Sequence, residues 1–216
     1  MEHLSGTLAV ILHADIVEST SLVQQDKRLA HERIQTSFQH FGEVIEKFQG
    51  RVLELRGDAL LASFKRSADA VSAALAFQVD HTDYNAQLQD DVRPIVRVGI
   101  SMGEVIIADN TVTGTGVVQA QRVEQLAHQG GVCITSAIYE SLSKHLPFNL
   151  ENLGEQVLKG FDDPVRIYRV KLNPGSKPPA PLSDDQSEIL SGVTKRIISI
   201  SVLLLLIVGG TIYWFR

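Results

Sequence analysis

The sequence predicts an α/β domain followed by an apolar C-terminal segment. Three observations support this. Strand-like apolar runs alternate with stretches of helical spacing. Of the 216 residues, 44% are hydrophobic and 21% are charged, which is typical of a protein that buries a full core. The chain also ends in a long uncharged stretch. The formal net charge of −5 argues against a nucleic-acid binder, because such proteins need a basic face.

The first half of the domain reads as a strand, a helix, a hairpin and a second helix. Residues 7–15 form a continuous apolar run, which favours a central strand. Residues 26–48 carry apolar side chains at helical spacing. Two short apolar runs around an Arg-Gly-Asp corner predict a hairpin over residues 51–64. A second helix is expected over residues 67–85, with Ser67 as its cap.

The second half continues the alternation and completes the fold prediction. It is expected to hold a pair of strand segments at residues 94–107 and a helix at 116–128. A strand at 130–136, a short helix at 137–146 and a closing strand at 164–170 follow. The two strand segments are expected to bend at Gly103. The order β-α-β-β-α-β, with a further helix and strand, is that of a ferredoxin-like sandwich. Cys133, the single cysteine, is predicted to be a buried strand residue and not a nucleophile.

The C-terminal part is predicted to be a tether and a membrane anchor. Residues 173–194 are rich in Pro, Ser and acidic residues and are expected to be a linker, so the folded domain is 1–172. Residues 197–215 are uncharged and long enough to cross a bilayer, and two basic residues precede them. We therefore expect a transmembrane anchor over 195–216, with the domain on the cytoplasmic side of the inner membrane. The N-terminus shows no signal-peptide pattern.

Two aspartates are predicted to form a metal site. Asp15 ends the first strand and is followed by a turn with the hydroxyls of Ser19 and Thr20, and Asp58 lies at the hairpin tip. In a ferredoxin-like sheet these strands are neighbours, and two converging carboxylates repel each other unless a cation lies between them. A metal ion that carries phosphate oxygens fits such a site. The simpler alternative is that one aspartate caps a helix and the other occupies a turn.

Six segments in series resemble the class III nucleotidyl cyclase catalytic domain over about residues 7–171. They are "ILHADIVESTSLV", "LRGDALLASF", "VRVGISMGEVIIAD", "GTGVVQAQRVEQLA", "GGVCITSAIYE" and "LGEQVLKGFDDPVRIYRV". The resemblance implies a lyase that converts a nucleoside triphosphate into a 3′,5′-cyclic mononucleotide and pyrophosphate, using two divalent cations, Mg²⁺ or Mn²⁺. It assigns these cations to Asp15, Asp58 and the backbone of Ile16.

The resemblance also implies the residues that bind the substrate phosphates. Arg122 matches the arginine that stabilises the transition state. Ser19 and Thr20 are expected to bind phosphate because their turn offers hydroxyls and backbone N–H groups beside Asp15. Arg97 and Lys159 match further phosphate ligands, although Arg97 is equally well explained as a solvated strand end. Family active sites form at the interface of a head-to-tail dimer. A homodimer with two equivalent sites is therefore expected.

The base-reading half departs from the family pattern. Glu54 replaces the lysine that reads adenine, Thr111 replaces an aspartate, and Val118 replaces the asparagine that orients the ribose. A carboxylate suits a donor edge such as that of guanine or the amino group of cytosine. ATP is placed first because most bacterial members are adenylate cyclases. GTP and a pyrimidine triphosphate, UTP or CTP, as used by some phage-defence cyclases, stay open.

A protein without catalytic activity is the alternative to an enzyme. Glu54 and Val118 favour a silent, membrane-tethered module that binds nucleotide or dimerises. The two aspartates together with Arg122 favour a signalling enzyme, which is the hypothesis adopted from the sequence.

Overall fold

The computed structural model describes residues 6–108, 111–143, 147–178 and 180–181. The chain divides into one compact unit, Met1–Ala180, and a remainder, Pro181–Arg216. The predicted anchor and most of the predicted linker lie outside the described residues. Among the helices that are described, none is long and apolar enough to cross a membrane.

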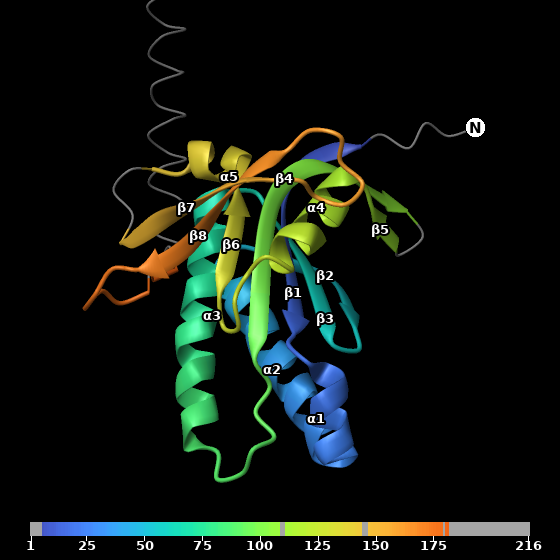
Figure 1. Cartoon of the computed structure of the whole chain (residues 1–216), viewed down its shortest axis with the longest axis vertical. Helices are drawn as coiled ribbons and strands as arrows, with labels where there is room; N and C mark the ends of the chain where they lie inside the picture. Colours follow the sequence, from blue (N-terminus) through green and yellow to red (C-terminus); the bar gives the residue numbers. More distant parts are fainter. Residues whose placement is uncertain (1–5, 109–110, 144–146, 179, 182–216) are drawn as a thin grey trace, which may run out of the picture. The chain divides into compact units, whose positions relative to one another are not determined.

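The described part of the domain alternates strands and helices (Figure 1). In chain order the elements are β1 (Thr7–Ile16), α1 (Ser19–Gln25), α2 (Lys27–Lys47), β2 (Arg51–Arg56), β3 (Ala59–Phe64), α3 (Ser67–Gln87), β4 (Val96–Ala108), β5 (Thr111–Thr113), α4 (Thr115–Glu124), β6 (Val132–Thr135), α5 (Ser136–Ser141), β7 (Phe148–Gln156) and β8 (Val165–Leu172).

The sheet has the core order that the sequence predicts. Its first four strands lie in the order β2-β3-β1-β4, and each neighbouring pair is antiparallel. With helices between β1 and β2 and between β3 and β4, this is the ferredoxin-like arrangement. Strands β6, β8 and β7 extend the sheet beyond β4, and the β4–β6 pair is parallel.

The two faces of the sheet are covered by different helices. Helices α2 and α3 lie on one face, and α4 lies on the other, over β1 and β4 (Figure 1). Strand β1 shows the division, because Ala14 joins the large core with α2 and α3, whereas Ile11 packs in a second cluster with Ala120 of α4. Side chains alternate along a strand. His13 and Asp15 therefore lie on the α4 face, with Ile11.

The pair of strand segments predicted over residues 94–107 forms one strand. Strand β4 runs without interruption from Val96 to Ala108. A Cβ atom added at Gly103 would lie 2.6 Å from the Cα atom of Gly116 in α4. The glycine is therefore explained by the close approach of α4 to the sheet.

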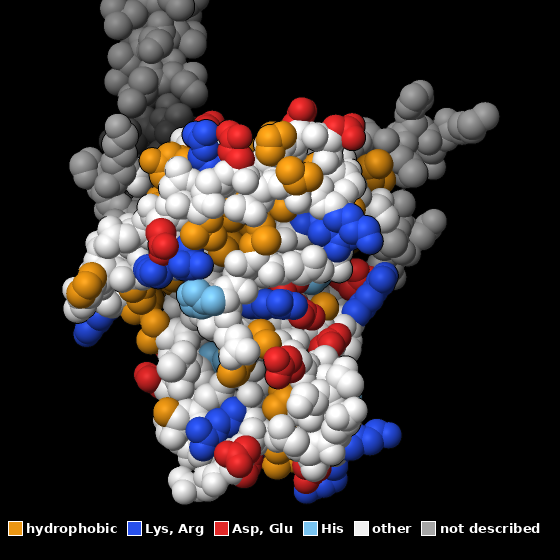
Figure 2. All heavy atoms as spheres, viewed as in Figure 1, with side chains coloured by type: hydrophobic (Ala, Val, Ile, Leu, Met, Phe, Trp, Pro, Cys, Tyr) orange, Lys and Arg blue, Asp and Glu red, His pale blue; other side chains and the backbone are white. Residues whose placement is uncertain are grey.

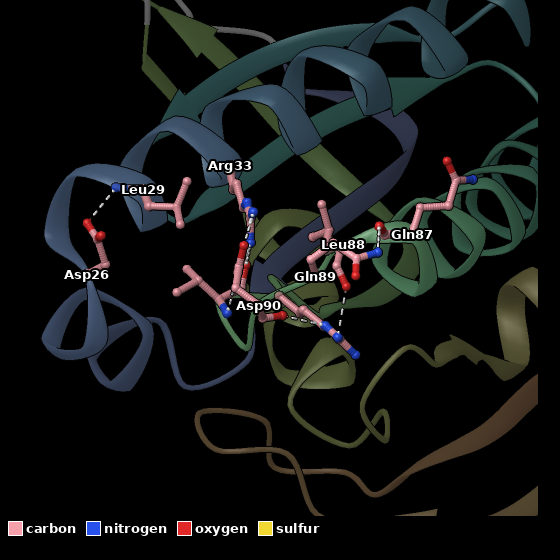
Figure 3. Close-up of polar contacts among 9 residues, drawn as sticks. Asp26, Leu29, Arg33, Gln87, Leu88, Gln89 and Asp90 are labelled. Carbon is pink, nitrogen blue, oxygen red and sulfur yellow. Dashed lines mark hydrogen bonds and ion pairs between the residues drawn. The ribbon is translucent and has the colours of Figure 1, made fainter.

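Two helix starts also differ from the prediction. The expected helix 26–48 begins as α2 at Lys27, after the separate short helix α1, and the Asp26 side chain accepts a hydrogen bond from the backbone N–H of Leu29, at 2.9 Å (Figure 3). Ser67 is the first residue of α3 and does not cap it. Its hydroxyl instead accepts a hydrogen bond from the Ser141 hydroxyl, at 2.6 Å.

An arginine of α2 fixes the loop that leads into β4 (Figure 3). Arg33 donates from Nη2 to Asp90 Oδ2 at 2.6 Å and also contacts the carbonyl oxygen of Val92. Arg93 donates to the carbonyl oxygens of Leu88, at 2.9 Å, and Asp90, at 2.8 Å. These contacts fix the chain just before β4, the strand that carries Arg97.

The prediction that Cys133 is a buried strand residue is confirmed. Cys133 lies in β6 and is fully buried. Burial raises the pKa of its thiol to about 11, so the thiol is neutral at physiological pH.

Candidate active site

The fold brings the two predicted metal carboxylates together. Asp15 is the penultimate residue of β1 and pairs with Ala59, the residue that follows Asp58. The backbone N–H of Ile16 donates to the carbonyl oxygen of Asp58 at 3.0 Å. The hydroxyl of Ser19, at the start of α1, donates to Asp58 Oδ2 at 2.5 Å. Strand end, hairpin tip and helix start therefore meet at one place, as the sequence predicts.

Negative charge gathers around Asp15. Burial raises the pKa of this carboxyl group above its ordinary value, and the charges of Glu124 and Asp58 raise it further. A hydrogen bond from Arg97 acts in the opposite direction: Nη2 donates to Asp15 Oδ2 at 3.0 Å. These two residues are register partners on β1 and β4. An additional cation at this point would relieve the remaining repulsion.

The donor set fits a hard divalent cation. Two carboxylates, the Ser19 hydroxyl and the backbone of Ile16 are all oxygen donors of the kind that Mg²⁺ and Mn²⁺ prefer. Within the described ranges, no three His, Cys, Asp or Glu residues form a complete metal cage. Mg²⁺ usually keeps several waters and binds one or two carboxylates together with substrate phosphates. The paired aspartates match that pattern of binding.

A cleft of about 730 Å³ opens beside Asp58. Ser19, Thr20 and Asp58 line it on the side of the aspartates. Three cationic or titratable side chains of α2 also line it, namely Lys27, Arg28 and His31. Figure 2 shows acidic and basic side chains side by side on this face of the molecule, in the region where Figure 1 places the end of β1 and the β2–β3 hairpin.

The predicted catalytic arginine points away from the carboxylates of its own chain. Glu124 is 2% exposed and faces the sheet. Arg122 lies two residues earlier on α4, a rotation of about 200° around the helix. Its Nη1 contacts Gln125 Oε1 at 3.5 Å, and its buried Nε has no hydrogen-bond partner among the described residues. The structure therefore does not bring Arg122 to Asp15 and Asp58 within one chain.

Glu54 is paired and lies on the α4 face. A register shift between Val52 and Glu54 marks a β-bulge in β2. The Glu54 carboxylate forms an ion pair with Arg56, two residues further along the strand. Both line a cavity of about 260 Å³ whose other walls include His13 and Gln121.

The other two positions expected to contact the base and ribose, Thr111 and Val118, lie close to each other in the sequence. Thr111 begins β5, and its backbone pairs with Ala108 of β4. Val118 lies on α4 with 40% of its side chain exposed. A single exposed apolar side chain is common on protein surfaces and by itself indicates neither a ligand nor a partner.

All of these residues lie within one family match. Residues 5–172 match the model of the adenylate and guanylate cyclase catalytic domain. The chain belongs to this family.

Relatives of the cyclase domain agree with this assignment. A putative adenylate cyclase of Rhizobium meliloti (strain 1021) is 32% identical over 171 residues, which cover 77% of this chain and 29% of the relative. The chain thus spans less than a third of that relative's length. The crystal structure of an adenylate/guanylate cyclase/hydrolase from Silicibacter pomeroyi has a TM-score of 0.71 at 22% identity, covering 78% of this chain and 99% of the other.

A second solved structure shares the cyclase fold. The adenylyl cyclase CyaB from P. aeruginosa superposes with a TM-score of 0.68 at 22% identity, covering 79% of this chain and 97% of the other. The mixed α and β fold predicted from the sequence is therefore confirmed as a cyclase-type fold.

One predicted phosphate ligand of the cyclase domain is not brought to the aspartates. Lys159 lies in the connection between β7 and β8. Leu158 and Phe161 of this connection pack in one cluster with Val123 of α4. No hydrogen bond or ion pair joins Lys159 to Asp15 or Asp58 among the residues described.

Sequence reasoning missed the neighbours of Arg97. Glu124 and His13 lie against each other, with His13 Nδ1 3.5 Å from Glu124 Oε2, and the Arg97 guanidinium forms an ion pair with Glu124. The only sign of these contacts in the sequence is that Glu124, a charged residue, lies on the face of its helix that is predicted to be buried. The basic side chains of α2 that line the cleft were also missed, because exposed cations on a helix usually mean only solvent contact.

Proposed function

We propose that the cyclase domain converts a nucleoside triphosphate into a 3′,5′-cyclic mononucleotide and pyrophosphate. The observation that carries this proposal is the meeting of Asp15, Asp58 and Ser19 beside a cleft, with Arg97 in contact with Asp15. Oxygen ligands for divalent cations and a fixed positive charge for phosphate oxygens are the elements that two-metal phosphoryl transfer requires.

The residues of the chain have separate roles in this proposal. Bound Mg²⁺ or Mn²⁺ would lower the pKa of the ribose 3′-hydroxyl and neutralise charge on the triphosphate. Asp15 and Asp58 supply the carboxylates that hold the cations, assisted by the backbone of Ile16. Ser19 donates to Asp58 and so fixes the orientation of that carboxylate. The 3′-hydroxyl would lose its proton to solvent as its oxygen attacks the α-phosphorus, the bond from that phosphorus to the oxygen shared with the β-phosphate would break, and pyrophosphate would leave.

A homodimer would complete the site. Arg122 faces away from its own aspartates, its Nε has no partner among the described residues, and no ion pair joins Lys159 to either aspartate among those residues. In a symmetric dimer each chain can offer these cations to the carboxylates of the other chain. Arg122 would then stabilise the charge that develops on the transferred phosphoryl group.

The Glu54–Arg56 pair bears on the choice of base. A free carboxylate offers two oxygens to the N1–H and N2–H donors of guanine. In the structure Arg56 already occupies Oε1 of Glu54, which leaves one oxygen for a single amino donor such as that of adenine or cytosine. We place ATP first, in line with the name of the Rhizobium relative, followed by GTP and the pyrimidine triphosphates UTP and CTP.

One observation favours a second function, a catalytically silent module that binds nucleotide or dimerises. Val118 has no hydrogen-bonding group to orient a ribose, and 40% of it is exposed on α4. An apolar residue there suits a contact with another protein surface as well as an active site.

The first prediction is a product assay that separates these functions. Purified protein is incubated with ATP, GTP, CTP and UTP in Mg²⁺ or Mn²⁺, and the products are identified by mass spectrometry. We expect a cyclic mononucleotide and pyrophosphate, with turnover reduced at least about 100-fold in Asp58→Ala, because one carboxylate ligand is lost. Asp83→Ala, an exposed aspartate of α3, is the matched control and retains turnover.

Two outcomes of this assay would contradict the proposal. If no triphosphate yields a cyclic product with either metal, the silent module is the better account. If Asp58→Ala keeps wild-type turnover, the metal assignment is wrong. In the same assay Glu54→Lys should shift preference toward ATP, and an unchanged preference would contradict base reading at this position.

We also propose that residues 195–216 anchor the domain in the inner membrane, with the catalytic domain in the cytoplasm. Support comes from the uncharged stretch 197–215 and the two basic residues before it. The second prediction is that the full chain sediments with membranes, whereas a chain ending at residue 181 stays in the soluble fraction. A full chain recovered in the soluble fraction would contradict the anchor.

A further inference from the structure

The buried glutamate of α4 has an unusual set of contacts. Glu124 is 2% exposed, and it forms an ion pair with Arg97 through Oε1. Its Oε2 lies 3.5 Å from His13 Nδ1. The same Arg97 donates from Nη2 to Asp15 Oδ2 at 3.0 Å. One guanidinium group therefore joins a buried carboxylate to a carboxylate that the proposed function assigns to metal binding.

The close approach of α4 to the sheet puts Glu124 in this place. Gly99 is the register partner of His13, and a Cβ atom there would lie 2.1 Å from the backbone nitrogen of Glu124 and 2.3 Å from the carbonyl oxygen of Ala120. The absent side chain at Gly99 lets the helix backbone lie against the strand. The Glu124 side chain then lies between His13 and Arg97.

We propose that Glu124 is a positioning residue, which holds the Arg97 guanidinium between itself and Asp15 and so limits how strongly Arg97 competes with a divalent cation for Asp15. This inference rests on the proposed metal-dependent function. A guanidinium presents a planar fork of donors, so Arg97 can contact both carboxylates at once. Glu124 neutralises part of the positive charge of Arg97, so Arg97 binds Asp15 less strongly and Asp15 stays available to a metal ion.

A purely structural ion pair makes different predictions. Burying Glu124 without a partner is costly, and Arg97 alone would remove that cost. Such a pair would affect stability and would leave the affinity of Asp15 for a cation unchanged. The contact between Arg97 and Asp15 is the observation that connects the pair to the metal site.

The third prediction concerns Mn²⁺ binding to the full-length protein without nucleotide, measured by EPR titration. Glu124→Gln leaves Arg97 with Asp15 as its one charged partner, so Mn²⁺ affinity should fall about three- to tenfold. Arg97→Lys keeps the charge but replaces the fork with a single ammonium group. We expect that group to stay with buried Glu124 and release Asp15, so Mn²⁺ affinity should rise about threefold.

Control variants define which sites are measured. Asp58→Ala should remove the Mn²⁺ signal that belongs to the site. Glu151→Gln removes an exposed carboxylate that is also shared by two cations, Arg169 at 3.1 Å and Lys171 at 2.8 Å, and it should leave Mn²⁺ affinity unchanged. Circular dichroism checks that each variant is folded. If Glu124→Gln does not fold, Arg97→Lys carries the test alone.

The outcomes separate this inference from the proposed function. Wild-type Mn²⁺ affinity in either Glu124→Gln or Arg97→Lys would overturn the positioning role, even in a protein that forms cyclic product. A lower Mn²⁺ affinity in Arg97→Lys would also overturn it, because the inference predicts that the lysine releases Asp15 and so raises the affinity. Turnover of the wild type, measured separately, tests the function itself.

Discussion

At the scale of single residues, glycines and one arginine define the site. Gly99 and Gly103 lie on β4 where α4 approaches the sheet most closely, and neither has room for a side chain. Arg97, on the same strand, contacts Asp15 and Glu124. The interpretation of Arg97 as a solvated strand end is therefore wrong, because both of its identified partners are carboxylates of the site. Its contact with substrate phosphate stays a prediction.

The fourth prediction is a stability measurement on Gly99→Ala. The added Cβ would meet backbone atoms of α4, which cannot rotate away, so the helix must shift. We expect a loss of about 1–3 kcal/mol in the free energy of unfolding, measured by urea denaturation. Gly42→Ala, in helix α2, is the control, since a Cβ atom at Gly42 would lie 3.7 Å from Val52 Cγ2, an ordinary contact distance.

The control should be neutral or stabilise the protein by up to about 1 kcal/mol, because alanine favours a helix more than glycine. Equal stability changes in the two variants would contradict the account of α4 packing. The Gly99→Ala protein should also bind Mn²⁺ differently from wild type, because the shift moves Glu124 relative to Arg97.

At the scale of secondary-structure elements, local patterns predicted most of the core. The apolar run of β1 and the alternating runs of β2 and β3 are patterns of neighbouring residues, so the sequence alone was sufficient to predict these strands. The same local signals placed Asp15 at a strand end and Asp58 at a hairpin tip. Because the ferredoxin-like order makes those strands neighbours, the meeting of the two aspartates could also be predicted.

Elements that depend on distant partners were not predicted. Strand β7, Phe148–Gln156, has few apolar residues and forms by pairing with β8 at the sheet edge. Strand β5 has three residues and depends on β4. Glu124 likewise gains its role from His13 and Arg97, which lie on two different strands. No sequence spacing reports such a contact, and only the packing of α4 on the sheet reveals it.

At the scale of the whole molecule, the division of the site between two chains is the main claim. One carboxylate lies at the end of β1 and the other in the turn between β2 and β3, and Arg122 faces away from them on α4. One chain therefore presents two incomplete halves of the proposed catalytic site. In a symmetric dimer each half would be completed by the other chain, and two variants with different defects should then restore one another.

The most direct test of this account mixes two inactive variants, Asp58→Ala and Arg122→Ala, and measures cyclic mononucleotide formation. If equal amounts of the two variants pair at random, half of the dimers contain one chain of each variant. Each of these mixed dimers has one site in which both Asp58 and Arg122 are intact. We predict recovery of about a quarter of wild-type turnover, while each variant alone stays at least about 100-fold below it. A mixture no more active than the separate variants, beside an active wild type, would contradict the account.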